Sequence, residues 1–368
     1  MLAIGDCLPL VMEYDNLHWD FREIDGYNRP FNSVISEREA GKTTALWHKG
    51  RLLFEKGATF ILTRQQKVSI TDVYLHDCEN VINKFIDDPE KRFRFLFNKG
   101  ALDSGIVDVR AQVGKGDPRL MFRCIALSNQ LSDMKSLMLP NCACHFGDEF
   151  IKDVRSGEKY LPREAWKYNE LINTFQREAP NRNFKSYLFG NPYSRANPYF
   201  VQWGVDISKL KRGTIWTNAQ CVVQCYEIKP ELREFIKAHN PLYQFDNAYT
   251  RYAFDGLAIN DSNMILKEKQ PQGFQLFCVV IIEGNKIGLY SSYVTSVDYV
   301  FWVGPVKDLS RTRVAYAFDF SDLQQGCVLI DAYGKNLLSR FAAAMAVRKV
   351  AFANSQYGYW AEQVYNFI

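Results

Sequence analysis

Residues 36–44 read SEREAGKTT and give the strongest indication of the fold of this chain. They end in the Gly-Lys-Thr of a phosphate-binding loop, with Ser36 where the usual pattern has glycine. Before them, residues 31–35 (FNSVI) form a short β-like run; after them, residues 43–56 are typical of a helix and residues 57–64 (GATFILTR) of a strand. This strand–loop–helix–strand order predicts an α/β fold with a mainly parallel sheet.

The loop stands where a phosphate cradle requires it, between a strand and a helix. Lys42 is expected to reach the β- and γ-phosphates of a nucleotide, and the Thr43 hydroxyl to coordinate Mg²⁺. Serine at position 36 resists backbone angles that glycine allows. Gly41, which lies beside the phosphates in such loops, is present, and Arg38 adds a positive charge three residues before it. The pattern favours a nucleotide site.

Two carboxylates supply the second half of such a site. Asp148 and Glu149 end the apolar run CACHFGDEF (142–150), about a hundred residues after the loop. Adjacent side chains of an extended segment point to opposite faces, so the two can take different tasks. We expect Asp148 to face the metal and Glu149 to face the attacking water as general base. A solvated acidic turn after a buried strand is the alternative.

Composition sets the outer limits of the interpretation. The 368 residues carry a formal net charge of +4, which permits contact with a polyanion without demanding it. The length predicts two domains. Nine cysteines without a CxxC pair indicate reduced, mostly buried thiols, and Cys142, Cys144 and His145 lack the second half of a zinc site. No apolar run is long enough to cross a membrane.

The pattern changes in the second half of the chain. Residues 69–100 look helical and charged, and the α/β alternation continues to about residue 228. Residues 229–264 suggest short helices in a hinge region. From Phe274 the sequence FQLFCVVIIEGNKIGLYSSYV predicts a hairpin with Gly284-Asn285 at its turn. A final basic, alanine-rich helix is expected from Lys335 to Ala353. Residues 265–368 thus predict a small α+β domain.

Three stretches resemble one family: the DNA-encapsidation ATPases of small, short-tailed bacteriophages with protein-primed genomes, relatives of terminase large subunits. SEREAGKTT has the arginine that packaging motors show before the glycine in their Walker A loop. HFGDEFIKD is similar to their Walker B strand end, and LFGNPYSRANPYF to a later strand that ends in a small residue and Asn. Such motors often relax the first glycine, so Ser36 does not count against a working loop.

The resemblance implies a P-loop ATPase domain of the ASCE type over residues 1–228, followed by a helical linker over 229–264. Lys42 and Thr43 match the phosphate and metal positions, and Asp148 and Glu149 match the magnesium carboxylate and the catalytic base. Asn191 matches the position that senses the γ-phosphate, with a strand-end cap as the alternative. ATP and Mg²⁺ are the implied cofactors.

An arginine finger from a neighbouring subunit is also implied, because charge on the γ-phosphoryl group needs a cation on its open side. The local match lies in TFQREAPNR, where Arg177 is preferred and Arg182 is the alternative. The implied partners are double-stranded DNA without sequence preference, a capsid portal, further copies in a ring of five, and a structural packaging RNA if the phage has one. The implied location is the host cytoplasm and, transiently, the procapsid portal vertex.

Residues 265–368 are expected to resemble an RNase H-like nuclease without nuclease activity. Such a nuclease needs a carboxylate in the middle of its opening strand, and this strand is apolar until Glu283 at the turn. The remaining acids, Asp298, Asp319, Asp322 and Asp331, do not complete a metal site. Candidate DNA contacts are residues 91–100 (KRFRFLFNKG), residues 209–213 (KLKRG), and Arg340, Arg348 and Lys349, each of which is otherwise a solvated charged surface.

The favoured hypothesis is therefore an ATPase that drives double-stranded DNA into a preformed capsid. Two alternatives stay open at this stage. One is another P-loop translocase or helicase, which would separate the strands of free duplex. The other is a non-catalytic interaction protein that retains an inactive loop.

Overall fold

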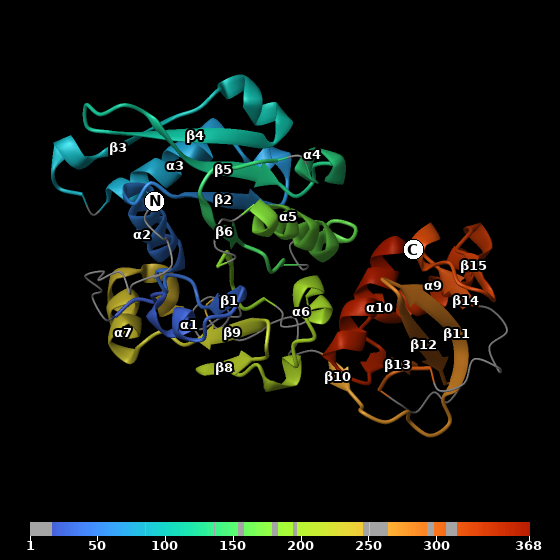
Figure 1. Ribbon diagram of the computed structural model, residues 1–368. Helices are drawn as coiled ribbons and strands as arrows, with labels where there is room; N and C mark the ends of the chain where they lie inside the picture. The colour runs from blue at the N-terminus through green and yellow to red at the C-terminus, as the bar shows by residue number, and fades with distance from the viewer. Residues whose placement is uncertain are drawn as a thin grey trace. The chain divides into compact units, whose positions relative to one another are not determined.

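A computed structural model describes residues 17–84, 86–135, 137–153, 158–178, 183–193, 197–245, 250, 264–292, 298–306 and 315–368. The chain divides into two compact units. The first comprises residues 1–193 and 209–258, and the second comprises residues 194–208 and 259–368 (Figure 1).

A nine-stranded sheet forms the first unit. Its order is β3-β4-β5-β2-β6-β7-β1-β9-β8, and the pairings from β5 through β9 are parallel. The strands in this order are Phe93–Leu96, Ile106–Val113, Arg119–Ala126, Thr59–Arg64, Cys142–Asp148, Lys185–Gly190, Phe31–Ser36, Cys221–Tyr226 and Thr214–Thr217. The predicted α/β fold is confirmed, and β7 lies as an additional strand between the loop strand β1 and the carboxylate strand β6.

Helices cover both faces of this sheet because alternate strand residues point to opposite sides. Phe146 of β6 shares a buried cluster with Leu46 of α2 (Lys42–Glu55) and Leu75 of α3 (Asp72–Asn83). Its neighbour His145 instead contacts Tyr168 of α5 (Glu164–Glu178). The short helix α4 (Leu131–Lys135) packs with α5. The sheet is therefore enclosed between two helical layers.

Segments for which the sequence predicted little are part of this core. Trp19, Phe21 and Ile24, the last in α1 (Arg22–Gly26), are almost completely buried. The N-terminal segment is thus a structural element of the first unit from residue 17 onward. The edge strand β8 and the parallel strand β9, which lies beside β1, were not anticipated.

The expectation of a helical segment over 69–100 is wrong in its second half. Helix α3 ends at Asn83, and Phe93–Leu96 forms the edge strand β3. The period-two order of Phe93, Arg94 and Phe95 decides this, because it buries both rings while the arginine stays exposed. Both rings pack in the core of the first unit from this strand.

The division into units differs from the predicted boundaries. Helix α7 (Pro230–His239) was expected in a separate linker but belongs to the first unit, with Leu232 and Ile236 buried. Helix α6 (Pro198–Gln202), expected in the ATPase domain, belongs to the second unit, where Val201 packs on the second core. Apolar contacts, and not the order of the elements along the chain, thus determine which unit each helix belongs to.

A seven-stranded mixed sheet forms the second unit. Its order is β10-β16-β13-β12-β11-β14-β15, with an antiparallel meander β11-β12-β13 at its centre and parallel strands on either side. The strands in this order are Ile265–Leu266, Val350–Phe352, Phe301–Pro305, Asn285–Ser291, Gln275–Ile282, Ala315–Ala317 and Cys327–Leu329. Helices α9 (Ala332–Ala346) and α10 (Ser355–Phe367) pack on its core, in agreement with the expected α+β domain.

Two details of this unit correct the sequence expectations. The hairpin turn is Glu283-Gly284, both with positive φ, while Asn285 already pairs with Ile282. The basic helix is not the last element. It ends at Ala346, Arg348 adopts a left-handed conformation with φ of 58°, and β16 and α10 follow.

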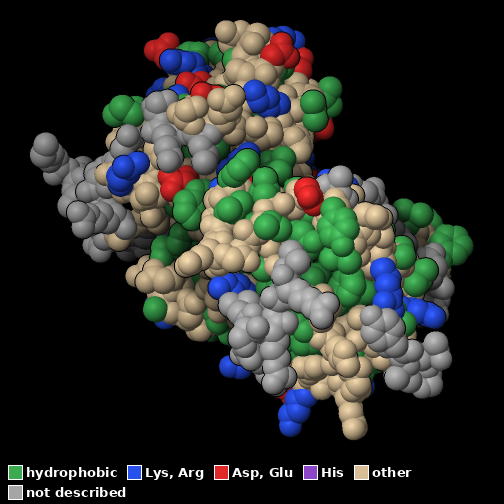
Figure 2. Space-filling view, turned by 90° about the vertical axis from the view of Figure 1, so that its right-hand side faces the viewer, with side chains coloured by type: hydrophobic (Ala, Val, Ile, Leu, Met, Phe, Trp, Pro, Cys, Tyr) green, Lys and Arg blue, Asp and Glu red, His purple; other side chains and the backbone are tan. Residues whose placement is uncertain are grey.

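On the face drawn in Figure 2, apolar side chains are exposed among polar ones. In the second unit, Phe320 and Tyr333 are among the large apolar side chains that are exposed. On the face drawn, Lys and Arg side chains lie scattered and do not gather in one patch. Among the described helices, none combines the length and apolar character that a membrane crossing requires.

Candidate active site

The phosphate loop lies between β1 and α2 and has the backbone geometry of an anion cradle. Gly41 caps α2 with φ of 91°, and Glu39 is also left-handed with φ of 64°. A Cβ at position 41 would lie 2.8 Å from the Cβ of His18, so the N-terminal segment closes over this glycine. Trp19 supports the loop by donating its backbone N–H to the carbonyl of Ala40 (2.8 Å). Only glycine fits at position 41.

Lys42 is the buried cation of this loop. Its Nζ donates to the carbonyl oxygens of Ser36 (3.1 Å) and Glu37 (2.9 Å) and to the hydroxyl of Ser36 (2.8 Å). Burial lowers the pKa of Lys42 to about 8, while the charges of Asp148 and Glu37 act in the opposite direction. Ser36, which departs from the usual glycine, therefore holds the lysine through both its hydroxyl and its carbonyl.

The acidic pair stands at the carboxyl end of β6, as predicted. Asp148 is the last residue of the strand, and burial followed by the charge of Glu149 raises its pKa. Glu149 does not continue the strand, because it adopts the left-handed conformation with φ of 56°. We expected the two carboxylates to point to opposite faces of a continuing strand, and this explanation is wrong because the strand ends at Asp148. A strained turn separates them, of the kind that clusters at functional sites.

Arg64 is a site residue that sequence reasoning missed. It ends β2, the neighbour of β6, and its Nη2 lies 3.3 Å from Oε2 of Glu149. The guanidinium also stacks 4.7 Å from the ring centre of Tyr74. Its positive charge lowers the pKa of Asp148 against the effect of burial. The sequence signal that could have identified it is its position at the end of a buried strand.

Asn191 joins the loop to the third strand of the site. It follows β7, whose Gly190 pairs with Ile35 of β1, and its Oδ1 accepts a hydrogen bond from Lys42 Nζ (3.3 Å). Arg38 donates to the hydroxyl of Tyr193 (3.1 Å), two residues further along. The carboxyl ends of β6, β7 and β1 thus bring together Asp148, Asn191 and the phosphate loop.

Oxygen donors of the kind that Mg²⁺ prefers are present at this edge. Thr43 is exposed in the first turn of α2, and Asp148 offers a carboxylate beside a second one. Among the described residues, no group of three or more His, Cys, Asp or Glu side chains could hold a metal ion. The residues fit Mg²⁺ held by one or two protein ligands together with phosphate oxygens.

Arg177 lies away from this edge. Helix α5 begins beside the carboxyl end of β2, where Glu164 accepts a hydrogen bond from Gln65 (2.6 Å). Arg177 is exposed in its last turn, thirteen residues and therefore about 20 Å of helix further on. The chain then enters β7 at its amino end, Lys185. The alternative, Arg182, lies outside the described residues.

The other sequence candidates have local roles where they are described. Asp322 accepts from the backbone N–H groups of Glu283 (3.0 Å) and Gly284 (2.8 Å), so it braces the hairpin turn. Asp331 caps α9 through Gly334 (2.8 Å). Asp319 similarly accepts from the backbone of Ser321, and Asp298 is exposed.

Of the candidate DNA contacts, Arg212 in residues 209–213 pairs with Glu37 in the phosphate loop (2.7 Å). Lys99 pairs with Asp72 (2.7 Å), and the guanidinium of Arg340 lies 5.7 Å from the ring centre of Phe301. The remaining cations on these stretches are all exposed: Lys91, Arg92, Arg94, Lys209, Lys211, Arg348 and Lys349.

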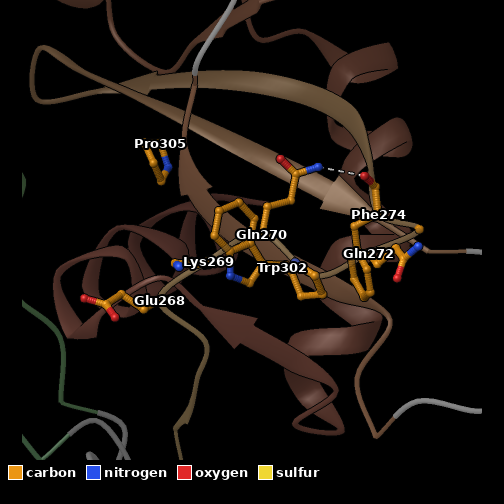
Figure 3. A pocket seen from close by; sticks show the side chains of 9 residues that line it. Glu268, Lys269, Gln270, Gln272, Phe274, Trp302 and Pro305 are labelled. Atoms are coloured by element: carbon orange, nitrogen blue, oxygen red, sulfur yellow. Dashed lines mark hydrogen bonds between the residues drawn. The ribbon is translucent and has the colours of Figure 1, made fainter.

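The second unit also has a pocket of about 510 Å³ (Figure 3). The loop before β11 and the strand β13 line it, and Gln270 donates to the carbonyl of Phe274 across one side (2.8 Å). Its lining residues are Glu268, Lys269, Gln270, Pro271, Gln272, Gly273, Phe274, Trp302 and Pro305. The charged residues among these are the neighbours Glu268 and Lys269. The lining therefore does not resemble the phosphate loop.

The comparisons with known proteins agree on one group. The family model of the podovirus DNA encapsidation protein (Gp16) matches residues 13–365. The DNA packaging protein of Bacillus phage B103 is 24% identical over 313 residues, which cover 84% of this chain and 88% of that protein. The Phi-28 gp11 DNA packaging motor has a TM-score of 0.63 at 17% identity, covering 96% of this chain and 98% of that one. The bacteriophage Phi-29 genome packaging motor assembly also has 0.63, at 20% identity, covering 95% and 99%.

Proposed function

Because the chain belongs to the podovirus DNA encapsidation protein family, we propose that it hydrolyses ATP at the β1–β6–β7 edge to drive double-stranded DNA into a preformed capsid. The observation that carries this proposal is the convergence of Lys42, Asn191 and the Asp148–Glu149 pair at one sheet edge. A phosphate-binding lysine after β1 and a candidate base after β6 thus come together, with the amide of Asn191 at the end of the intervening strand β7.

Each residue has a task that its surroundings suit. The N–H groups of the loop and the Lys42 ammonium bind the β- and γ-phosphates, after Nζ exchanges its present carbonyl partners for phosphate oxygens. Thr43 and Asp148 would hold Mg²⁺, which neutralises phosphate charge when bound. Glu149, with its side chain 59% exposed, orients a water molecule and takes its proton. Asn191 is placed to respond to the γ-phosphate through the lysine.

The partners follow from this function and from the relatives, which are packaging motors by name. We propose a homo-oligomeric ring of five on the portal vertex of an empty capsid, in the host cytoplasm, with a structural RNA if the phage has one. Arg177 is proposed as the finger for the next subunit, with Arg182 as the alternative. Helix α5 carries Arg177 away from its own Lys42, which suits a role in trans.

We further propose that the second unit has no nuclease activity. Support comes from the apolar opening strand β11 and from Asp322 and Asp331, whose carboxylates brace a turn and cap a helix. DNA contact is proposed through the phosphate backbone, since a motor must grip any sequence.

The test is Glu149→Gln, which keeps the size of the side chain but cannot take a proton. Magnesium-ATP should still bind, while hydrolysis with capsids and duplex DNA should fall by at least about a hundredfold. Glu55→Gln, an exposed glutamate at the end of α2, is the matched control and should keep wild-type turnover. Wild-type turnover by Glu149→Gln would remove the assigned base, and failure of the unaltered protein to bind ATP would overturn the function itself.

A further inference from the structure

Glu37 is a buried carboxylate inside the phosphate loop, directly after Ser36. Only 1% of the residue is exposed. Its Oε1 accepts a hydrogen bond from Nε of Arg212 (2.8 Å) and lies 2.7 Å from the same residue's Nη2. Nη2 of Arg233 lies 3.5 Å from the same oxygen, and the backbone N–H of Ile228 donates to Oε2 (3.4 Å).

The cluster is balanced in charge. Glu227, which follows β9, lies 3.4 Å from Arg212 Nη2 and 3.9 Å from Arg233 Nη2. Two carboxylates therefore face two guanidinium groups. Arg212 comes from the turn before β8 and Arg233 from α7, so elements far along the chain close on one loop residue. Burying the Glu37 carboxylate without these partners would be strongly unfavourable.

The two ends of Glu37 face in different directions. Its side chain is held by the arginines, while its backbone carbonyl accepts from Lys42 Nζ (2.9 Å). The loop between Glu37 and Lys42 contains the left-handed residues Glu39 and Gly41. A loop with such angles keeps its shape only when surrounding contacts determine it. The anchoring of Glu37 is therefore directly linked to the shape of the cradle and to the position of the ammonium group.

We propose that Arg212 and Arg233 are positioning residues that act through Glu37 to hold the phosphate loop in its nucleotide-binding shape. This rests on the proposed ATP-binding function. Pre-organisation lowers the entropy that binding must remove, and it affects bound substrate and transition state alike. The cluster thus sets affinity for ATP, and so KM, while kcat stays nearly constant. Arg212 serves the loop and not the DNA.

The experiment measures the dissociation constant of magnesium-ATP together with kcat and KM. In Glu37→Gln, which leaves two partly buried arginines without the carboxylate that they share, the dissociation constant and KM should rise at least about tenfold, with kcat changed less than about threefold. The double variant Glu37→Gln/Arg212→Gln removes one charge of each sign, so its loss of affinity should be smaller than the product of the two single losses. Arg212→Lys keeps the positive charge but loses the planar guanidinium group. Its affinity for magnesium-ATP should therefore lie between those of Arg212→Gln and the wild type.

Arg123→Gln is the matched control. It breaks an arginine–carboxylate pair of similar geometry with Asp108 (2.5 Å), on strands β5 and β4 of the same sheet. Its ATP affinity should equal that of the wild type. Equal affinity in Glu37→Gln, or a fall in kcat at unchanged KM, would overturn the positioning role, since loss of folded protein alone lowers apparent kcat. Absence of ATP binding by the unaltered chain would instead refute the proposed function.

Discussion

The Nζ of Lys42 lies 3.3 Å from Oδ1 of Asn191, a residue 149 positions later in the chain. The contact exists because β7 lies beside β1 with Gly190 opposite Ile35, so the residue after β7 emerges next to the phosphate loop. A lysine that exchanges its partners on phosphate binding changes what this amide contacts. The pair therefore links the phosphate loop to the residue that follows β7.

Replacing the amide of Asn191 should lower the rate of ATP hydrolysis without a comparable loss of ATP binding. In Asn191→Ala, Lys42 keeps its loop carbonyls, so ATP affinity should change less than about threefold, while kcat should fall about tenfold or more. Steady-state kinetics with capsids and duplex DNA measure both. Asn218→Ala, a turn asparagine between β8 and β9, is the control and should leave kcat unchanged. Unchanged kcat in Asn191→Ala would leave this residue as a strand-end cap.

Arg64 should support catalysis by holding Glu149 and moderating the charge of the acidic pair. Arg64→Gln removes the cation 3.3 Å from Glu149, so kcat should fall about tenfold. Arg64→Lys keeps a charge without the planar fork and should recover part of that loss. Equal rates for both variants and the wild type would show that the ion pair has no part in turnover.

The proposed finger can be tested by mixing two inactive variants. Arg177→Ala keeps its own Glu149, and Glu149→Gln keeps its own Arg177. If Arg177 acts on the neighbouring subunit, mixed rings contain some interfaces with both groups intact, and hydrolysis should reappear. If the finger acts within one chain, or if Arg182 supplies it, mixing should restore nothing or Arg177→Ala should not be inactive.

His145 should make the fold sensitive to acid. It is buried in the first sheet between Thr63 and Ser186, each 2.8 Å from a ring nitrogen, and burial lowers its pKa from 6.5 to about 3. Between these values the unfolded chain binds the extra proton. The free energy of unfolding should therefore be highest above about pH 6.5 and fall by up to about 1.4 kcal/mol per pH unit below it.

Chemical unfolding of His145→Gln at several pH values measures this contribution. The variant should show a shallower fall between about pH 6 and pH 4 than the wild type. His76→Gln removes a half-exposed imidazole on α3 and should keep the wild-type slope. Parallel curves for His145→Gln and the wild type would contradict the assignment.

Asp322 should matter for stability of the second unit. Asp322→Ala leaves the backbone N–H groups of Glu283 and Gly284 without their buried acceptor, which should cost about 2 kcal/mol of unfolding free energy. Asp319→Ala removes an exposed cap nearby and should cost about 1 kcal/mol or less. A loss no larger for Asp322→Ala than for Asp319→Ala would mean that the carboxylate does not brace the turn.

The sequence alone determined the features that depend on neighbouring residues. The strand, loop and helix around Lys42, the strand ending in Asp148 and the apolar hairpin before and after Gly284 are all local patterns of hydrophobicity and turn chemistry. They were sufficient to predict the parallel sheet and to name the phosphate and acidic groups. They misplaced the turn by one residue, because a turn of two left-handed residues accommodates Glu283 as well as glycine.

Which distant groups meet depends on the order of the strands in the folded sheet. Arg64 reaches Glu149 because β2 lies beside β6. Arg212 reaches Glu37 because β9 pairs with both β1 and β8, the strand that follows Arg212. The residues around Arg212 do not distinguish it from a surface cation, and the buried strand that ends in Arg64 does not indicate which carboxylate the arginine meets. Strand order is set by the burial of whole faces of the sheet, a property of the assembled fold, and it therefore determines the ion pairs of the site.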